Sequence, residues 1–246
     1  EYSKENVPMV PKHFLPVSIK GFKDGDYAMT YGYPGSTNRY ETSYGIKLKN
    51  DIENPVLVGL RDMRLKYMHE QMVKDPAVKL KLASNYATVA NYWKFYDGET
   101  KQLLKYDVYG QKQKAEAVFN AWAKDKTEYA SIFSDWEKAY EAWKPYAKHR
   151  TYINEGINGS PLIAFAGTLM QVENALVSTN AKAADVTKAI DAANKAREAF
   201  LKDENKLSDE RIVASVTQMF YNDIVEAQHP ISFYYTIKTT YGKLDD

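Results

Sequence analysis

Helical periodicity runs through this chain from about residue 50 to residue 228, and it constrains the fold more than any other feature. Apolar residues recur there at intervals of three and four, as they do on the buried side of a helix. The pattern predicts helices over residues 54–72 and 76–98, two more between 110 and 143, and then 161–176, 185–201 and 208–228. We therefore expect a mainly α, multi-helix domain over residues 50–246.

Proline and glycine mark where several of these helices start and stop. Three helices are predicted to begin with a capping side chain followed by proline, at Asn54 with Pro55, Asp75 with Pro76, and Ser160 with Pro161. Three predicted stops or breaks are Gly98, Pro145 and Pro230. The helix after Pro76 has an apolar stripe of Leu82, Tyr86, Val89, Ala90 and Trp93, beside a polar row of Ser84, Thr88 and Asn91.

Residues 1–49 differ from the rest of the chain in composition and pattern, and they predict a short extended or β segment. They are rich in proline, glycine and alternating residue types. Residues 24–32 have the pattern of a turn that leads into a strand, which residues 33–35 then end. Residues 40–47 form a second extended stretch. The predicted boundary between the β segment and the helical domain lies at residue 49.

Composition excludes several function classes. The 246 residues include 33 Lys plus Arg and 32 Asp plus Glu, for a net charge of +1, which argues against a nucleic-acid surface. No apolar run approaches the length of about 18 residues that spans a bilayer, so we expect no membrane span. With no cysteine there is no disulfide, thiolate zinc site or cysteine nucleophile. The absence of cysteine does not identify the cellular compartment of the protein.

Three motifs resemble catalytic or binding sites, and each has a simpler structural explanation. The four histidines (His13, His69, His149 and His229) fall in separate segments without metal-binding spacing, so we expect no metal site. Asp24 and Asp26 fit a turn better than a paired-carboxylate site. Residues 32–37 lack the lysine and the spacing of a phosphate loop.

Residues 156–161 are similar to the nucleophile loop of trypsin-like proteases, but they do not carry its chemistry. The nucleophile position holds Asn158, and an amide is not activated by a neighbouring histidine as a hydroxyl is. Ser160 with Pro161 is better explained as a helix cap. We therefore predict no catalytic nucleophile in this motif.

The order of motifs in the first 100 residues resembles a known family. The runs are Glu5 to Pro8, Pro11 to Ser18, Gly25 to Tyr40, Asn54 with Pro55, Leu60 to Arg64, and Ala90 to Lys94. This order is similar to the bacterial dipeptidyl-peptidase seven and eleven type serine exopeptidases. Met9 departs from the pattern, where an aromatic residue is expected. Beyond about residue 100 only the helical texture supports the resemblance.

The resemblance implies an architecture and an activity. In that family a large helical domain is inserted into a chymotrypsin-like double β-barrel, with the catalytic His and Asp before the region matching Glu1 and the Ser after the region matching Asp246. Residues 1–49 would start the second barrel, and residues 50–246 would form a lid. The start at Glu1, with neither an initiator Met nor a signal peptide, fits a piece of a longer chain. We expect the piece alone to be inactive.

The resemblance also implies a substrate contact at Asn91. The family holds the free α-amino group of a peptide with an asparagine in the segment matching Asn91 to Lys94. An amide oxygen that accepts from an ammonium makes a charge-assisted hydrogen bond, worth about 1.5–3 kcal/mol. The simpler alternative is that Asn91 is a polar residue flanking the buried stripe.

Two functions from different classes are therefore compatible with the sequence. The first is the helical, substrate-covering domain of a serine dipeptidyl peptidase, which needs no metal or organic cofactor. Its expected partners are the amino terminus of an oligopeptide and the rest of the double barrel, in a homodimeric parent of the bacterial periplasm or cell surface. The alternative is a non-enzymatic helical protein-binding or scaffold module, which an exposed apolar patch would favour.

Overall fold

The computed structural model describes residues 3–27, 29, 31–32, 37–180 and 182–242. The chain divides into two units, Glu1–Arg39 and Tyr40–Asp246, and each is described by itself. Within the described residues, helices and turns are the only regular elements. The chain is therefore mainly α, as its periodicity predicted.

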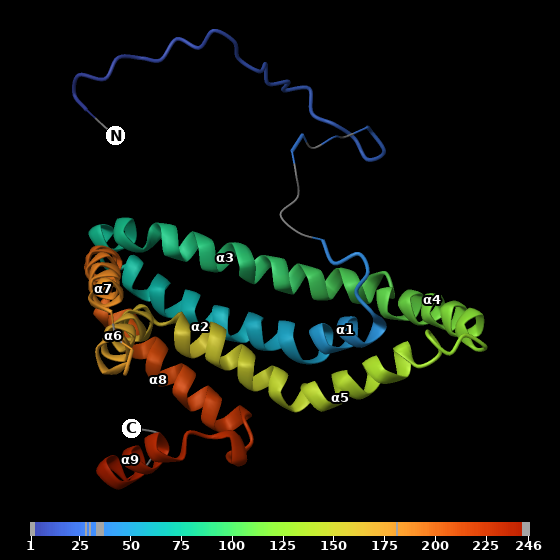
Figure 1. The fold of residues 1–246 in the computed structure, drawn as a ribbon. Coiled ribbons are helices and arrows are strands. Elements are labelled where there is room, and N and C mark those ends of the chain that lie inside the picture. The colour runs from blue at the N-terminus through green and yellow to red at the C-terminus, as the bar shows by residue number, and fades with distance from the viewer. Residues whose placement is uncertain (1–2, 28, 30, 33–36, 181, 243–246) are drawn as a thin grey trace. The chain divides into compact units, whose positions relative to one another are not determined.

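Unit Tyr40–Asp246 is a succession of helices (Figure 1). The α-helices are α1 (Ser43–Leu48), α2 (Asn54–Met72), α3 (Pro76–Lys105), α4 (Val108–Ala123), α5 (Ile132–Thr151), α6 (Pro161–Val177), α7 (Ala183–Asp203), α8 (Lys206–Asp223) and α9 (Ile231–Tyr241). Two π-helical turns, η1 (Lys49–Glu53) and η2 (Tyr152–Gly156), and two 3₁₀ turns, η3 (Ile157–Gly159) and η4 (Glu226–Gln228), connect some of them.

Unit Glu1–Arg39 contains the predicted turn but no strand among its described residues. The Lys23 amide donates to Asp26 Oδ2 at 2.7 Å, and Gly25 has a φ of +89°, which favours glycine. The turn is confirmed, whereas the strand expected within residues 24–32 is absent from their described part. A strand needs a second strand to pair its backbone groups, and the described residues provide none. Residues 28, 30 and 33–36 of this prediction lie outside the described residues.

Residues 43–48, expected to be extended, form helix α1. The Thr42 side chain caps this helix by accepting from the Gly45 amide at 3.3 Å. The Ser43 amide and hydroxyl both donate to Glu116 of α4, at 2.7 and 2.6 Å. The cap and this contact with a distant helix stabilise a conformation that residue alternation alone did not reveal.

Helix α2 begins at Asn54 as predicted, but Asn54 does not cap it, because α1, η1 and α2 follow one another without a break. Asn54 has helical backbone angles and is buried, and its Nδ2 donates to Glu99 at 2.9 Å and Thr100 at 3.0 Å. The side chain therefore joins α2 to α3 and does not cap a helix. Pro55 is the second residue after the π-helical turn η1, where the helical hydrogen-bond pattern changes.

The other two predicted starts are confirmed. Asp75 accepts from the Ala77 amide at 2.7 Å, and the Ser160 hydroxyl accepts from the Ile163 amide at 3.2 Å. The predicted stops hold less well: α3 continues past Gly98 to Lys105, and α5 continues past Pro145 to Thr151. Helix α8 ends at Asp223, before the predicted limit, and Pro230 directly precedes α9.

The core lies where α2, α3, α8 and η2 meet. One cluster consists of Leu60, Tyr152, Val216, Phe220, Ile224 and Tyr234, and a second of Met68, Met72, Leu82, Val89 and Ile212. Figure 1 shows α3 lying along α2, with α8 crossing near the start of α6. Tyr152 and Tyr234 lie outside the predicted helices, and the other members lie within predicted helices 54–72, 76–98 and 208–228. The burial of Leu82 and Val89 fixes which side of α3 faces outward.

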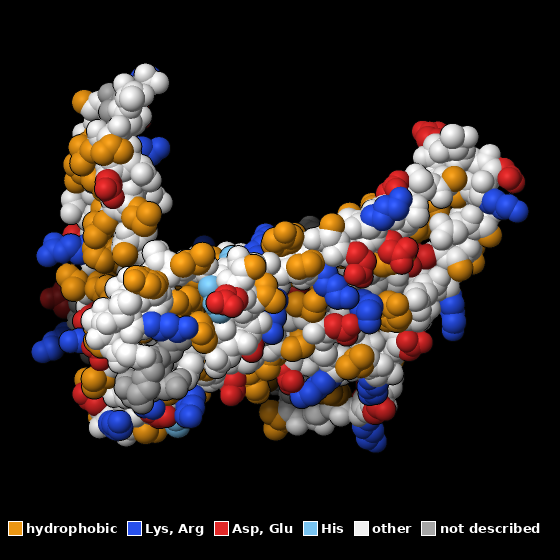
Figure 2. Space-filling model, turned by 90° about the horizontal axis from the view of Figure 1, so that it is seen from below, with side chains coloured by type: hydrophobic (Ala, Val, Ile, Leu, Met, Phe, Trp, Pro, Cys, Tyr) orange, Lys and Arg blue, Asp and Glu red, His pale blue; other side chains and the backbone are white. Residues whose placement is uncertain are grey.

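Two other predicted apolar faces remain largely open. On α4, Ala115, Val118 and Trp122 recur at helical spacing, yet all three side chains are exposed. Helix α6 has no buried residue, and it forms a hairpin with α7 that Phe165 and Phe200 hold together by stacking at 5.3 Å. Figure 2 shows hydrophobic side chains on the arm that this hairpin forms. Exposed members are Leu162, Leu169, Met170, Leu176, Val177, Ile190 and Leu201.

Candidate functional site

The outward face of α3 is the candidate site, and it contains Asn91. Leu82 and Val89 are buried against α2, which sets the rotation of the helix. Asn91 follows Val89 by two residues, about 200° further around the helix, and therefore faces away from the core. The exposed side chains of this face are Ser84, Thr88, Asn91 and Phe95. The predicted polar row is thus a solvent-exposed face.

The Asn91 amide is available to a ligand. Thr88 donates its hydroxyl to the Ser84 carbonyl at 3.0 Å, so this donor is used within the helix. Within the described part of the chain, the Asn91 side chain makes no hydrogen bond. The neighbouring rings are ordered against one another, with Phe95 and Tyr96 edge to face at 5.3 Å. An exposed amide beside aromatic rings can accept from a cation and contact the apolar part of a peptide.

A buried ionic cluster lies directly behind this face. Arg61 of α2 donates to Glu155 Oε2 at 2.5 Å, and Arg64 donates to Glu155 Oε1 at 2.7 Å. The two arginine side chains are 11% exposed and the glutamate side chain is 13% exposed. One carboxylate of the π-helical turn η2 therefore binds two guanidinium groups. Burial lowers the pKa of Arg64, and the adjacent Glu155 opposes this change.

Arg61 connects the cluster to α3. It donates to the Val89 carbonyl at 3.4 Å, and its guanidinium carbon lies 5.3 Å from the ring centroid of Tyr92 and 5.6 Å from that of Tyr96. These distances are those of cation–π contacts. The segment that contains Asn91 is therefore held from behind by a charged side chain of α2.

The sequence did not reveal this cluster, because Glu155 is 94 residues from Arg61 along the chain. A local signal was present. Arg61 and Arg64 interrupt the apolar face that Leu60 and Leu65 mark, and an arginine near a buried face is expected to have an acidic partner. Nothing in the pattern identifies the partner as Glu155.

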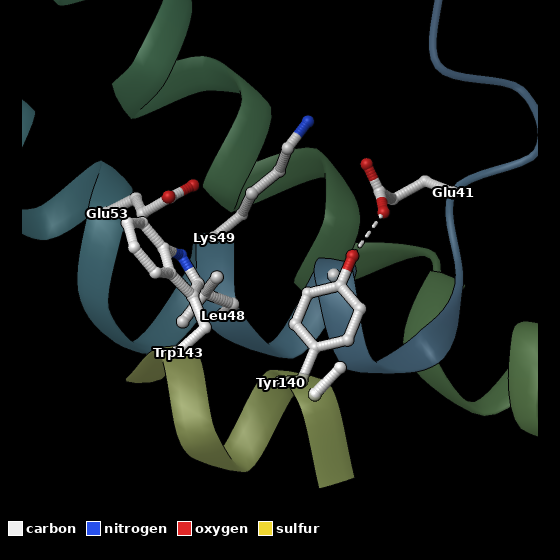
Figure 3. A pocket seen from close by; sticks show the side chains of 8 residues that line it. Glu41, Leu48, Lys49, Glu53, Tyr140 and Trp143 are labelled. Atoms are coloured by element: carbon white, nitrogen blue, oxygen red, sulfur yellow. Dashed lines mark hydrogen bonds between the residues drawn. The ribbon is translucent and has the colours of Figure 1, made fainter. Parts of the chain in front are cut away.

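A separate open pocket of about 370 Å³ lies between α1, η1 and α5 (Figure 3). Glu41 accepts from the Tyr140 hydroxyl at 3.1 Å, and burial raises the pKa of Glu53. Lys49 lies between the two carboxylates in Figure 3 and pairs with Glu99 at 3.8 Å. The pocket already contains its own cation, and its described lining residues include no serine, threonine, cysteine or histidine.

Ser160 and His229 have structural contacts, and residues 33–36 of the glycine-containing motif lie outside the described residues. Asn158 is exposed, while Ser160 is buried as the cap of α6 and donates to Asp209 Oδ2 at 3.0 Å. His229 has its Nε2 2.7 Å from the Ile224 carbonyl oxygen. In the part of the chain that the structure describes, no three His, Asp or Glu side chains gather as metal ligands. No helix among those residues is long and apolar enough to cross a membrane.

Comparison with known proteins gives one consistent family. The Peptidase S46 family profile matches residues 1–244. The Asp/Glu-specific dipeptidyl-peptidase of Capnocytophaga gingivalis is 40% identical over 180 residues, which are 72% of this chain and 25% of that protein. The Asp/Glu-specific dipeptidyl-peptidase of Flavobacterium psychrophilum is 35% identical over 235 residues, covering 94% of this chain and 33% of that protein.

Further similarities agree with these. Dipeptidyl-peptidase 7 of Porphyromonas gingivalis is 37% identical over 195 residues, covering 78% of this chain and 27% of that protein. The crystal structure of Porphyromonas endodontalis DPP11 in complex with the dipeptide Arg-Glu matches with a TM-score of 0.69 and 26% identity, over 99% of this chain and 35% of that one. The chain spans about a third or less of the length of these relatives.

Proposed function

Because the chain belongs to the Peptidase S46 family, as its motifs predicted, we propose that it is the helical, substrate-covering part of a serine dipeptidyl peptidase. The observation that carries the proposal is the family match over residues 1–244, together with relatives named as dipeptidyl-peptidases. The parent enzyme would remove dipeptides from peptide amino termini. The helical part would cover the cleft and exclude large folded substrates.

Asn91 is the proposed substrate contact. Its exposed amide oxygen would accept from the α-ammonium of the peptide, in a charge-assisted hydrogen bond. A fixed contact at the amino terminus sets the distance to the bond that is cut, which makes the products dipeptides. Support comes from the outward face of α3, where the side chain has no hydrogen-bond partner among the described residues.

The bond cleavage itself is assigned to residues of the parent outside this chain. A serine hydroxyl activated by a histidine would attack the second carbonyl of the peptide, and backbone amides would stabilise the oxyanion. The histidines of the helical unit do not support such a role. His69 and His149 lie against the rings of Tyr86 and Phe220, and His229 lies against the Ile224 carbonyl. We therefore propose that the 246-residue piece alone is inactive and needs no cofactor.

The rest of the double barrel is the proposed partner of residues 1–39. Apolar side chains in this unit are almost fully exposed, including Val10 at 88%, Ile19 at 97% and Phe22 at 91%. Side chains of this kind are usually covered by other protein surface. We also propose that the parent is a homodimer of the bacterial periplasm or cell surface. The dimer and the compartment rest on the family resemblance alone.

A second candidate function is a helical module that binds another protein without catalysis. The exposed apolar side chains of the α6–α7 hairpin favour it, because a patch of this kind often marks an interface. The family match favours the peptidase. The two differ in whether the longer protein cleaves peptides.

The test compares the longer protein with its Asn91→Ala variant on a dipeptidyl fluorogenic substrate, with a free or an acetylated amino terminus. The wild type should strongly prefer the free amine. The variant should lose roughly ten- to hundredfold in kcat/KM on that substrate and little on the blocked one. Equal use of both substrates, or an indifferent variant, would remove Asn91 from the site. No cleavage by the wild type would favour the binding module.

A further inference from the structure

We propose that Arg61 is a positioning residue that holds the Asn91 segment of α3 in register with the substrate. This inference rests on the proposed role of Asn91 and names the group that supports it. Arg61 does not itself reach the outward face of α3. It contacts the inner side of the same helical turn, at the Val89 carbonyl and the ring of Tyr92.

The contacts of Arg61 bracket Asn91 along the helix. Val89 lies two residues before Asn91, and Tyr92 follows it directly. Tyr96 lies one turn further along and also contacts the Arg61 guanidinium, at 5.6 Å. Arg61 therefore holds both ends of the short stretch that contains Asn91. A displacement of about 1 Å in a positioned group can reduce a rate by as much as about a hundredfold, so such a support has a functional effect.

The two arginines of the buried cluster share one carboxylate as their ion-pair partner. Glu155 alone binds Arg61 and Arg64, and all three side chains are largely buried. Arg61 Nε and Arg64 Nε are buried without a hydrogen-bond partner within the described residues. A buried ion pair adds little net stability, because the cost of desolvation offsets the attraction between the charges. What the cluster contributes is a fixed position for its side chains. Of its two arginines, Arg61 is the one with a described hydrogen bond and ring contacts to α3.

Arg64 provides a matched control. It makes the same type of ion pair with the same carboxylate, at 2.7 Å, and is equally buried. Its hydrogen bonds go to Glu155 alone, and it has no ring contact with α3 in the described structure. Removing either arginine leaves Glu155 paired with the other one. The two substitutions should therefore have similar effects on folding and different effects on Asn91.

The experiment uses the longer protein with the same free and acetylated dipeptidyl substrates. Arg61→Met should lower kcat/KM on the free-amine substrate roughly tenfold, with little change on the acetylated one. Arg64→Met should change both substrates by the same small factor. Circular dichroism and thermal unfolding check that both variants fold. If Arg61→Met does not fold, Arg61→Lys keeps the charge without the planar contact and should show the same selective loss.

A double-mutant cycle separates this inference from the proposed function. If Arg61 acts through Asn91, the Arg61→Met change should cost little more in a protein that already has Asn91→Ala. If Asn91→Ala reduces use of the free amine but Arg61→Met affects both substrates equally, the positioning role is wrong and the proposed function stands. If Asn91→Ala has no effect, the proposed function fails and this inference fails with it.

Discussion

The packed centre around α2 and α8 buries its apolar residues, whereas the hairpin of α6 and α7 leaves many of its apolar residues exposed. Leu60 and Val216 of the centre are 0% exposed, whereas Leu169 and Leu176 of the hairpin are 49% and 60% exposed. Both regions show helical apolar periodicity in the sequence. The difference teaches that periodicity predicts a helix and its apolar face, but not whether another element covers that face.

The hairpin is nevertheless attached by a specific polar junction. Asp209 of α8 accepts from the Ser160 hydroxyl at 3.0 Å and from the Leu162 amide at 3.2 Å, both at the start of α6. This contact sets where the hairpin leaves the centre. The stability of the unit should therefore depend strongly on the centre, less on the junction and least on the hairpin surface.

The largest expected effect is a cavity in the centre. Leu60→Ala should lower the free energy of unfolding by about 2–5 kcal/mol, because its side chain is fully buried among Tyr152, Val216 and Phe220. The matched change Leu169→Ala on the hairpin should cost less than about 1 kcal/mol, since half of that side chain is exposed. Urea unfolding of both variants measures the difference. Equal losses would contradict the contrast between the regions.

Two glycines provide a sharper comparison of the regions. A β-carbon at Gly156 would overlap the Val216 side chain and lie 3.2 Å from Leu60 Cδ2, so Gly156→Ala should destabilise by about 1–3 kcal/mol. At Gly167, inside α6, a β-carbon has nothing within 4 Å. Gly167→Ala should stabilise by about 0.5–1 kcal/mol through helix propensity. Thermal unfolding should give shifts of opposite sign. Two losses would contradict the open space at Gly167, and two gains would contradict the overlap at Gly156.

The smallest expected effect is a pH dependence at the junction. Burial raises the pKa of Asp209, so the folded state binds more protons than the unfolded state between the ordinary carboxyl value and the raised one. Stability should therefore fall as pH rises through that window, which starts near pH 4. Asp209→Asn keeps an acceptor for Ser160 and Leu162 without this dependence.

The measurement for this prediction is urea unfolding of the wild type and the Asp209→Asn variant at several pH values. The free energies of unfolding of the two proteins should be closest below pH 4. As pH rises, that of the variant should increase relative to that of the wild type. A wild type that becomes relatively more stable at higher pH would mean that its hydrogen bonds outweigh its burial.

Local chemistry explains which parts of the fold were predictable. The caps at Asp75 and Ser160 depend on residues within one turn, so sequence alone identifies them. Asn54 has the same pattern, but its side chain bonds to α3, some 45 residues away. The predicted strand within residues 24–32 likewise depended on partners that local pattern does not contain.

The candidate site likewise has features that the sequence predicted and features that depend on distant residues. The exposure of Asn91 follows from the phase of the α3 stripe, and the sequence predicted this stripe and the polar row beside it. Its role came from the family resemblance, and it stays a prediction. The support from Arg61 was not predicted, because it needs Glu155 to approach from η2. The domain boundary at residue 49 also stays a prediction.

The most direct test of the proposed function is a crystal structure of the longer protein with a dipeptide product bound. We predict that the Asn91 amide oxygen lies about 2.7–3.2 Å from the ammonium nitrogen of the dipeptide. A dipeptide bound in the cleft with its ammonium held by other groups, and with Asn91 out of hydrogen-bond reach, would contradict the proposed role of Asn91.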